Sequence, residues 1–192
     1  LRNRGIDFLG PDIGKLKCGE FGIGRISSTK NIIRYVLQTL KNIKYLNKKK
    51  CLVTAGPTIE MIDPIRYISN QSSGKQGYEI ASQLALYGAK VILISGPTSL
   101  DQPPGVEFIK IKTAGEMYKE INKISNIDIG IFTAAVSDFK TNKTKNQKIK
   151  KNNSIKINLV KNIDILEKIG NDKNIRPKFL VGFAAETGGK LL

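Results

Sequence analysis

The sequence contains no histidine, and its two cysteines stand far apart at positions 18 and 51. The absence of histidine excludes Ser-His-Asp catalysis, Cys-His catalysis and histidine-ligated zinc within this chain. Two distant cysteines form neither a disulfide framework nor a metal-ligand pair, which fits a reducing cytosol. Any proton transfer must therefore use aspartate, glutamate, lysine, cysteine, tyrosine or water.

Long apolar runs are also absent, since none approaches the roughly 20 residues of a membrane span. The first residues, LRNRGIDFLG, contain neither a methionine nor the apolar core of a signal peptide. We therefore expect a cytoplasmic protein with no membrane partner. We also expect the chain to be a piece of a longer protein.

Negative charge is scarce, with 16 acidic residues against 32 lysines and arginines and a formal net charge of +16. Such an excess commonly indicates nucleic acid. Here the basic residues are scattered among Asn and Ile, and aromatic residues do not alternate with the basic run at residues 140–151. We expect no nucleic-acid partner and favour polyphosphate bound at one site. A non-catalytic basic module that binds RNA or DNA is the alternative.

Strands and helices alternate from residue 50 onward, with turn residues between them. Such alternation predicts an α/β fold, namely a doubly wound, mostly parallel, Rossmann-like sheet with helices on both faces. Ligands of these sheets bind beyond the carboxyl ends of the strands. The predicted strands are residues 51–53, 91–94, 106–111, 128–136, 155–159 and 179–184, and the predicted helices are residues 74–87, 115–124 and 163–169.

The residues before this pattern differ in character. Residues 1–28 contain two glycine-spaced turns and too little apolar matter to fold alone, and residues 32–43 have the apolar spacing of a helix. Residues 47–50 are a polar linker. We therefore predict domains at residues 1–46 and 51–192.

Two glycine-containing loops, residues 54–58 and 72–77, follow the first strand of the alternating pattern. Backbone N–H groups in such loops can point at an anion, and the second loop lies at a predicted helix N-terminus. Arg66 and Asn70 lie between the loops and add a cation and an amide. This combination suits a phosphorylated substrate that bears a carboxylate, although residues 72–77 could also be an ordinary serine cap and glycine turn.

Familiar nucleotide fingerprints are missing from these loops. No G-x-G-x-x-G follows the strand, and Ser72-Ser73-Gly74-Lys75 lacks the Gly-Lys-Ser/Thr order of a Walker A loop. An NAD(P)-dependent oxidoreductase is therefore a disfavoured alternative.

Three further side chains have both a chemical and an ordinary interpretation. Asp138 ends a predicted strand and could hold Mg²⁺ or cap the next turn. Lysines at residues 148–151 could neutralise a triphosphate as pyrophosphate leaves, or form a solvated run. Cys18 lies near glycines and is either a reactive thiol or an ordinary loop cysteine.

Six motifs occur in order over residues 50–187: TAGPTIEMIDPIRYISNQSSGKQGYEIA, VILISGPTSL, FTAAVSDF, QKIKK, LVKNIDIL and FLVGFAAET. Together they resemble phosphopantothenoylcysteine synthetase, the C-terminal half of the bifunctional CoaBC family of coenzyme A synthesis. Residues 1–28 resemble the end of the other half, a flavin-dependent decarboxylase. The family's Ala-Cys-Gly-Asp-like motif falls on Lys17-Cys18-Gly19-Glu20.

The resemblance implies a two-step ligation. CTP, with Mg²⁺, activates the carboxylate of 4'-phosphopantothenate as an acyl-cytidylate, and the amine of L-cysteine then displaces CMP. The decarboxylase half uses FMN. Family members complete the site by dimerisation, so we expect a homo-oligomer. The family pattern continues past residue 192, so we expect the ligase domain to be truncated at its C-terminus.

The resemblance also implies roles for individual residues. Cys18 would donate a proton in the decarboxylase, Asn70 would orient the acyl intermediate, and Lys151 would serve cytidylate formation. Ser137 replaces an alanine common in bacterial members and is similar to the serine of eukaryotic relatives that accept ATP, so both CTP and ATP remain candidates. Ile163 separately replaces a usual proline. The predicted substrate-binding residues are Arg66, Asn70, Ser72, Gly74 and Lys75; the predicted nucleotide-binding residues are Ala135, Val136, Ser137, Asp138, Phe139, Lys151, Ile163, Asp164, Ile165, Leu166 and Phe183; Asp138 is the candidate metal ligand.

Overall fold

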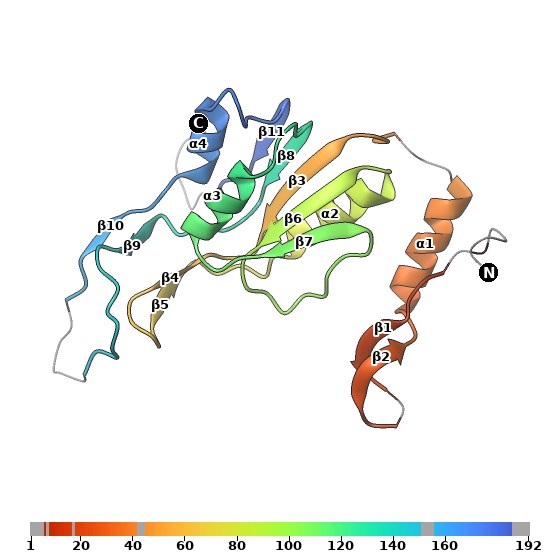
Figure 1. Cartoon of the computed structure of the whole chain (residues 1–192), viewed down its shortest axis with the longest axis horizontal. Coiled ribbons are helices and arrows are strands. Elements are labelled where there is room, and N and C mark those ends of the chain that lie inside the picture. Colours follow the sequence, from red (N-terminus) through yellow and green to blue (C-terminus); the bar gives the residue numbers. More distant parts are fainter. Residues whose placement is uncertain (1–5, 7, 17, 42–44, 151–155, 186–192) are drawn as a thin grey trace. The chain divides into compact units, whose positions relative to one another are not determined.

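The computed structural model describes the chain except for residues 1–5, 7, 17, 42–44, 151–155 and 186–192 (Figure 1). The chain divides into two compact units, Leu1–Tyr45 and Leu46–Leu192. None of the helices in the described part is long and apolar enough to span a bilayer.

The first unit contains a β-hairpin and a helix. Strands β1 (Asp12–Lys15) and β2 (Phe21–Arg25) pair antiparallel, and α1 (Thr29–Lys41) follows. The helix was predicted from its apolar spacing, and Ser28 Oγ accepts a hydrogen bond from Asn31 N near its start. The hairpin was not predicted, because glycines interrupt both strands and glycine weakens a strand pattern.

The second unit is built on a five-stranded sheet in the order β11-β8-β3-β6-β7, in which every strand pair is parallel. This unit begins with the central strand β3, adds β6 and β7 on one side, and then adds β8 and β11 on the other side. The strand order therefore reverses between β3 and β8. The bounds are β3 (Lys50–Ala55), β6 (Lys90–Ser95), β7 (Val106–Lys110), β8 (Ile129–Phe132) and β11 (Phe179–Gly182).

Helices cover both faces of this sheet, as predicted (Figure 1). Successive residues of β3 point to opposite faces, so Cys51 and Val53 pack with Tyr78 and Ala81 of α2 (Lys75–Leu86). Leu52 instead packs in a second core with α3 (Ala114–Asn122) and α4 (Ile165–Asn171). The second core includes Ile92, Ile94, Met117, Ile121, Phe132, Ile165 and Ile169.

Hydrogen bonds that the sequence predicted cap the start of α3. Thr113 and Glu116 form the predicted capping box, with Glu116 N donating to Thr113 Oγ1 at 3.1 Å. A long-range contact supports the same helix end, because buried Glu60 accepts a hydrogen bond from Ala114 N at 2.9 Å. Glu60 belongs to β4 (Ile59–Met61), which pairs antiparallel with β5 (Tyr67–Ser69).

The strand predicted at residues 128–136 is shorter than expected. Its segment continues along β3 by two bonds, Thr133 N to Thr54 O and Ala135 N to Gly56 O. Opposite Ala135 stands Pro57, which forms only an isolated bridge. The two segments thus stay hydrogen-bonded beyond Phe132, where the regular strand ends.

The segment after β8 also differs from the prediction. Strand β9 (Phe139–Thr141) pairs antiparallel with β10 (Leu159–Lys161), so the basic segment starts in a strand. Of the alternating strand predicted at residues 155–159, only Leu159 lies in β10, and residue 155 is outside the described residues. Helix α4 begins at Ile165, because Asp164 is its N-cap and accepts a hydrogen bond from Glu167 N at 2.9 Å.

Candidate active site

The segments that leave β3 and β8 run side by side at the point where the strand order reverses. Thr58 N donates to Ala135 O at 3.2 Å, and Ser137 N donates to Thr58 Oγ1 at 2.9 Å. These bonds hold residues 54–58 against residues 133–137 along the carboxyl edge of the sheet. This is the edge at which doubly wound sheets bind ligands.

Asn70 joins this wall from the end of β5. Its Nδ2 donates to Val136 O at 2.9 Å, and the neighbouring Ser69 Oγ donates to Thr58 O at 2.8 Å. Asn70 itself is exposed. The structure thus brings a predicted substrate-binding residue into direct contact with a predicted nucleotide-binding residue 66 positions away.

Ser137 directs its hydroxyl into the protein rather than outward. Its side chain is buried, and Oγ donates to Phe139 O at 2.9 Å. Asn162 Nδ2 donates to Ser137 O, and Asn162 N donates to Asp138 O, so β10 braces the same turn. Asp138 and Phe139 are exposed beyond it. Sequence analysis missed Asn162, although it stands within the motif LVKNIDIL.

The remaining predicted nucleotide-binding residues are placed at the ends of β10 and β11. Ile165 lies in the hydrophobic core, whereas Asp164, Leu166 and Phe183 are exposed, and the Asp164 carboxylate caps α4. Phe183 N donates to Phe132 O at 3.1 Å, which puts Phe183 at the carboxyl end of β11 beside β8. Ile163 packs against the core.

The two predicted anion loops meet. Gly56 and Gly74 both have positive φ, of 69° and 73°, which favours glycine. A Cβ on Gly74 would stand 2.7 Å from Thr98 Cγ2 and 3.4 Å from Gly56 Cα, so a third loop, after β6, joins them. Ser72 Oγ accepts from Gly74 N at 3.3 Å and Ser73 Oγ accepts from Lys75 N at 3.4 Å, at the start of the 12-residue helix α2.

A buried carboxylate organises the loop that carries Arg66. Asp63 is fully buried, and its Oδ1 accepts from Ile65 N and Arg66 N, each at 2.8 Å. Its Oδ2 accepts from Arg66 Nη1 at 2.9 Å and from Ile149 N at 3.1 Å. The predicted lysine run is therefore tied to the β4–β5 hairpin through Ile149. Lys148 and Lys150 flank this anchor and are exposed, whereas Lys151 lies outside the described residues.

These contacts determine how Asp63 titrates. Burial by itself raises the pKa of the carboxyl group, but the backbone N–H donors and the Arg66 charge outweigh it and lower the pKa from 3.8 to about 2. Because the folded pKa lies below the unfolded one, Asp63 stabilises the fold above about pH 4, and this contribution disappears as the pH falls toward 2.

We therefore expect the difference in unfolding free energy between the wild type and Asp63→Asn to be constant above about pH 4 and to shrink as the pH falls toward 2. Urea unfolding of both proteins from pH 7 to pH 2 measures it. A difference in unfolding free energy that stays constant down to pH 2 would show that the charge of Asp63 does not stabilise the fold.

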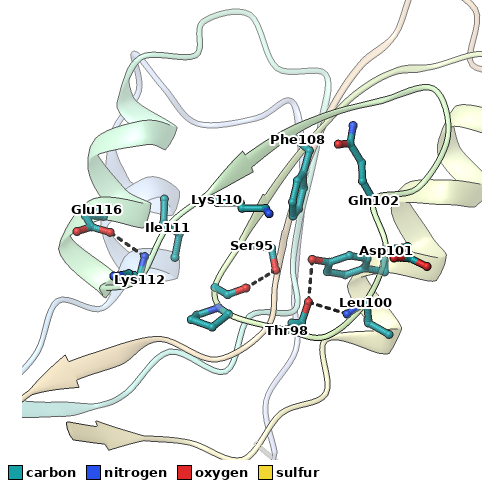
Figure 2. Close-up of a pocket in the computed structure, with 13 residues that line it drawn as sticks. Ser95, Thr98, Leu100, Asp101, Gln102, Phe108, Lys110, Ile111, Lys112 and Glu116 are labelled. Atoms are coloured by element: carbon teal, nitrogen blue, oxygen red, sulfur yellow. Dashed lines mark hydrogen bonds between the residues drawn. The ribbon is translucent and has the colours of Figure 1, made fainter. Parts of the chain in front are cut away.

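A cavity of about 660 Å³ lies next to the anion loops, at the carboxyl ends of β6 and β7 (Figure 2). Thr98 Oγ1 donates there to the hydroxyl of Tyr78 at 2.9 Å. Phe108 forms an apolar wall, and Lys110 Nζ lies over its ring. The predicted site residues that the structure describes do not line this cavity. Sequence analysis missed it because Tyr78 and Phe108 have the spacing of core residues. Its lining is Tyr78, Ser95, Gly96, Pro97, Thr98, Leu100, Asp101, Gln102, Phe108, Lys110, Ile111, Lys112 and Glu116.

Two predicted site residues, Cys18 and Asp138, remain to be placed. Cys18 is an exposed free thiol in the turn between β1 and β2, within the first unit. Within the described ranges no three acidic or thiol side chains gather as a metal site. Exposed Asp138 fits Mg²⁺ only as a single carboxylate whose other ligands are phosphates and water, which is a common arrangement for this ion.

The fold and the edge described above define a doubly wound α/β domain with glycine loops gathered where its strand order reverses. The family model of the DNA/pantothenate metabolism flavoprotein C-terminal domain matches residues 46–191, and the chain belongs to this family. The resemblance inferred from the motifs is thereby confirmed.

Known relatives agree with this assignment. The chain is 45% identical to the coenzyme A biosynthesis bifunctional protein CoaBC of Borreliella burgdorferi, over 100% of this chain and 50% of that protein. It is 41% identical to CoaBC of Escherichia coli K12, over 97% of this chain and 47% of that protein. The chain therefore spans about half the length of the curated relatives it matches.

Solved structures show the same fold. The C-terminal domain of a CoaBC protein superposes with a TM-score of 0.65 and 40% identity, covering 74% of this chain and 67% of that one. The DNA/pantothenate metabolism flavoprotein of Streptococcus pneumoniae superposes with a TM-score of 0.56 and 25% identity, covering 64% of each chain.

Proposed function

We propose that the second unit is the ligase that joins L-cysteine to 4'-phosphopantothenate in coenzyme A biosynthesis. A nucleoside triphosphate would transfer its nucleotidyl group to the carboxylate and release pyrophosphate, and the cysteine amine would then displace the nucleoside monophosphate. The observation that carries the proposal is the contact of Asn70 with Val136 at the carboxyl edge, between residues of the two predicted sets.

The anion loops are the proposed cradle for the triphosphate. Gly56 and Gly74 let backbone approach an anion closely, and Lys75 follows at the first residue of α2. Backbone N–H groups and a helix N-terminus stabilise phosphate without desolvating a buried charge. Phe183 is exposed at the carboxyl end of β11, which lies on the side of β8 away from β3. There it would pack against the nucleoside.

Asn70 is the proposed orienting residue for the acyl group. Because Val136 O holds the amide nitrogen at 2.9 Å, the orientation of the amide group is fixed and its oxygen is a pre-positioned acceptor. Arg66 would attract the substrate's negative charge, while Asp63 and Ile149 O hold its guanidinium in place. Fixing reacting groups in advance is a large part of catalysis in such reactions.

The departing pyrophosphate requires positive charge. We assign this role to Lys151, just after the anchored Ile149, and to Mg²⁺ held by Asp138 together with the phosphates. In the longer protein, Cys18 would serve the FMN-dependent decarboxylase half. We further propose a cytoplasmic homo-oligomer.

The function is tested by pyrophosphate release from CTP and from ATP in the full-length protein. We expect release to require 4'-phosphopantothenate, and a single turnover to proceed without cysteine because activation precedes displacement. Release that does not depend on phosphopantothenate, or no release from either nucleotide, would contradict the proposal.

A matched variant in the same assay tests whether Ser137 influences the choice between CTP and ATP. The Ser137 hydroxyl is bonded to Phe139 O, so serine offers the ligand no additional polar group relative to alanine. We expect CTP to be preferred and Ser137→Ala to leave the CTP-to-ATP ratio of kcat/KM within about threefold, since threefold is under 1 kcal/mol. A larger change would mean that the hydroxyl reaches the nucleotide.

A further inference from the structure

The segment that carries Lys148 and Lys150 is held to the β4–β5 hairpin by a short series of bonds. Thr141 Oγ1 and Thr144 Oγ1 donate to Met61 O, at 3.0 and 3.2 Å, and Lys145 N donates to Ile62 O at 2.9 Å. These three bonds end on backbone carbonyls.

The contacts of Ile149 are different, because both of their partners are charged side chains. Ile149 N donates to Asp63 Oδ2, and Ile149 O accepts from Arg66 Nη1 at 3.2 Å. Both backbone polar groups of Ile149 are thus bonded to one ion pair, 2.9 Å long, whose carboxylate is fully buried. The contact joins residues 86 positions apart and holds the backbone between the two flanking lysines next to Arg66.

A carboxylate is needed at this position for two reasons. Four donors converge on the two oxygens of Asp63, so an amide there would turn N–H groups toward donors. Arg66 also carries the charge that pairs with Asp63 at 2.9 Å, and the same guanidinium donates to Ile149 O. Removing the carboxylate charge leaves Arg66 without its ionic partner and a backbone N–H without an acceptor.

We propose that Asp63 is a positioning residue: through Ile149 and Arg66 it holds the Lys148–Lys150 segment in one arrangement beside the hairpin that presents Asn70. The anchoring stands on the contacts alone. Its catalytic consequence rests on the proposed function, in which these cations face a triphosphate and a phosphorylated acid.

The anchoring is tested by amide hydrogen exchange in the full-length protein at pH 7. Asp63→Asn keeps the shape of the side chain and removes its charge. We expect the Ile149 amide and its neighbours in residues 145–150 to exchange at least about tenfold faster, while β3 and β6 keep their protection.

Asp128→Asn is the matched control. Asp128 also forms an ion pair, with Lys178 Nζ at 2.8 Å, and accepts from Lys50 N at 3.0 Å, but it lies at the amino edge of the sheet. Exchange in residues 145–150 should not change in this variant. Unchanged exchange in Asp63→Asn, or an Ile149 amide without protection in the wild type, overturns the anchoring; the wild-type measurement decides the matter even if Asp63→Asn does not fold.

Kinetics of pyrophosphate release test the catalytic consequence. A misplacement of about 1 Å away from the reacting atoms can lower a rate about 100-fold. We expect Asp63→Asn to lower kcat by about 100-fold with a smaller change in the KM for nucleotide, and Asp128→Asn to stay within about threefold of the wild type. Equal losses in the two variants would overturn the positioning role. A wild type without phosphopantothenate-dependent release would instead refute the proposed function, while hydrogen exchange still decides the anchoring.

Discussion

Replacing Asn70 by aspartate should lower kcat/KM for phosphopantothenate-dependent pyrophosphate release by about 1000-fold. The amide nitrogen donates to Val136 O at 2.9 Å, and aspartate would put a carboxylate oxygen against that carbonyl. The side chain would turn away and add a negative charge where an anionic substrate binds. Loss of one positioned polar group commonly costs 100- to about 1000-fold, and charge repulsion adds to it.

Gln71→Glu is the control for this experiment. Gln71 is the next residue along the chain and is also exposed, so the variant adds the same charge without removing the Asn70 bond. We expect a loss of less than about tenfold, since two exposed unit charges about 4 Å apart in water interact by only about 1 kcal/mol. Similar losses in the two variants would assign the effect to charge and not to orientation. Because Asn70 is exposed, both proteins should unfold at the wild-type temperature.

The largest loss of stability is expected for Gly96→Ala. Gly96 follows β6, and a Cβ there would stand 1.6 Å from Pro57 O and 2.8 Å from Pro57 C. Neither atom can move without shifting the backbone that leaves β3. Overpacking costs about 1–3 kcal/mol and sometimes more. We expect at least about 3 kcal/mol, or a Tm lower by roughly 10 °C for a chain of this size.

Gly182→Ala is the matched comparison for Gly96. A Cβ on Gly182 would stand 2.3 Å from Leu166 Cδ2, which is the end of a half-exposed side chain that can rotate away. We expect a cost of about 1 kcal/mol or less, because a side chain yields where a backbone carbonyl does not. Thermal unfolding of both variants checks the pair. Equal destabilisation would mean that the residues after β3 accommodate the extra atom.

The central sheet could be predicted because its signals are local. Strands β3, β6 and β8 are apolar runs, β7 alternates, and the capping box at Thr113 and Glu116 marks a helix start within four residues. The two-stranded sheets β4-β5 and β9-β10 could not be predicted. Strands β4, β5, β9 and β10 are three residues long, which is too short for an alternating pattern to stand out in the sequence.

The candidate site follows the same division. The rule that ligands bind at the carboxyl edge was sufficient to place Val136 and Phe183 there. It did not show that the Ser137 hydroxyl turns inward or that Asp63 reaches Ile149, because both depend on side-chain directions set by the whole fold.

Asp128 makes the opposite edge of the sheet independent of this chemistry. Its carboxylate binds Lys50 N and Lys178 Nζ, while its own N–H and C=O bond to Lys50 O and Phe179 N. Three neighbouring strands are therefore held together at their amino ends, at the edge opposite the proposed site. The loops at the far ends can then accumulate substitutions, and substrate preference can drift during evolution, without loosening the framework that carries them.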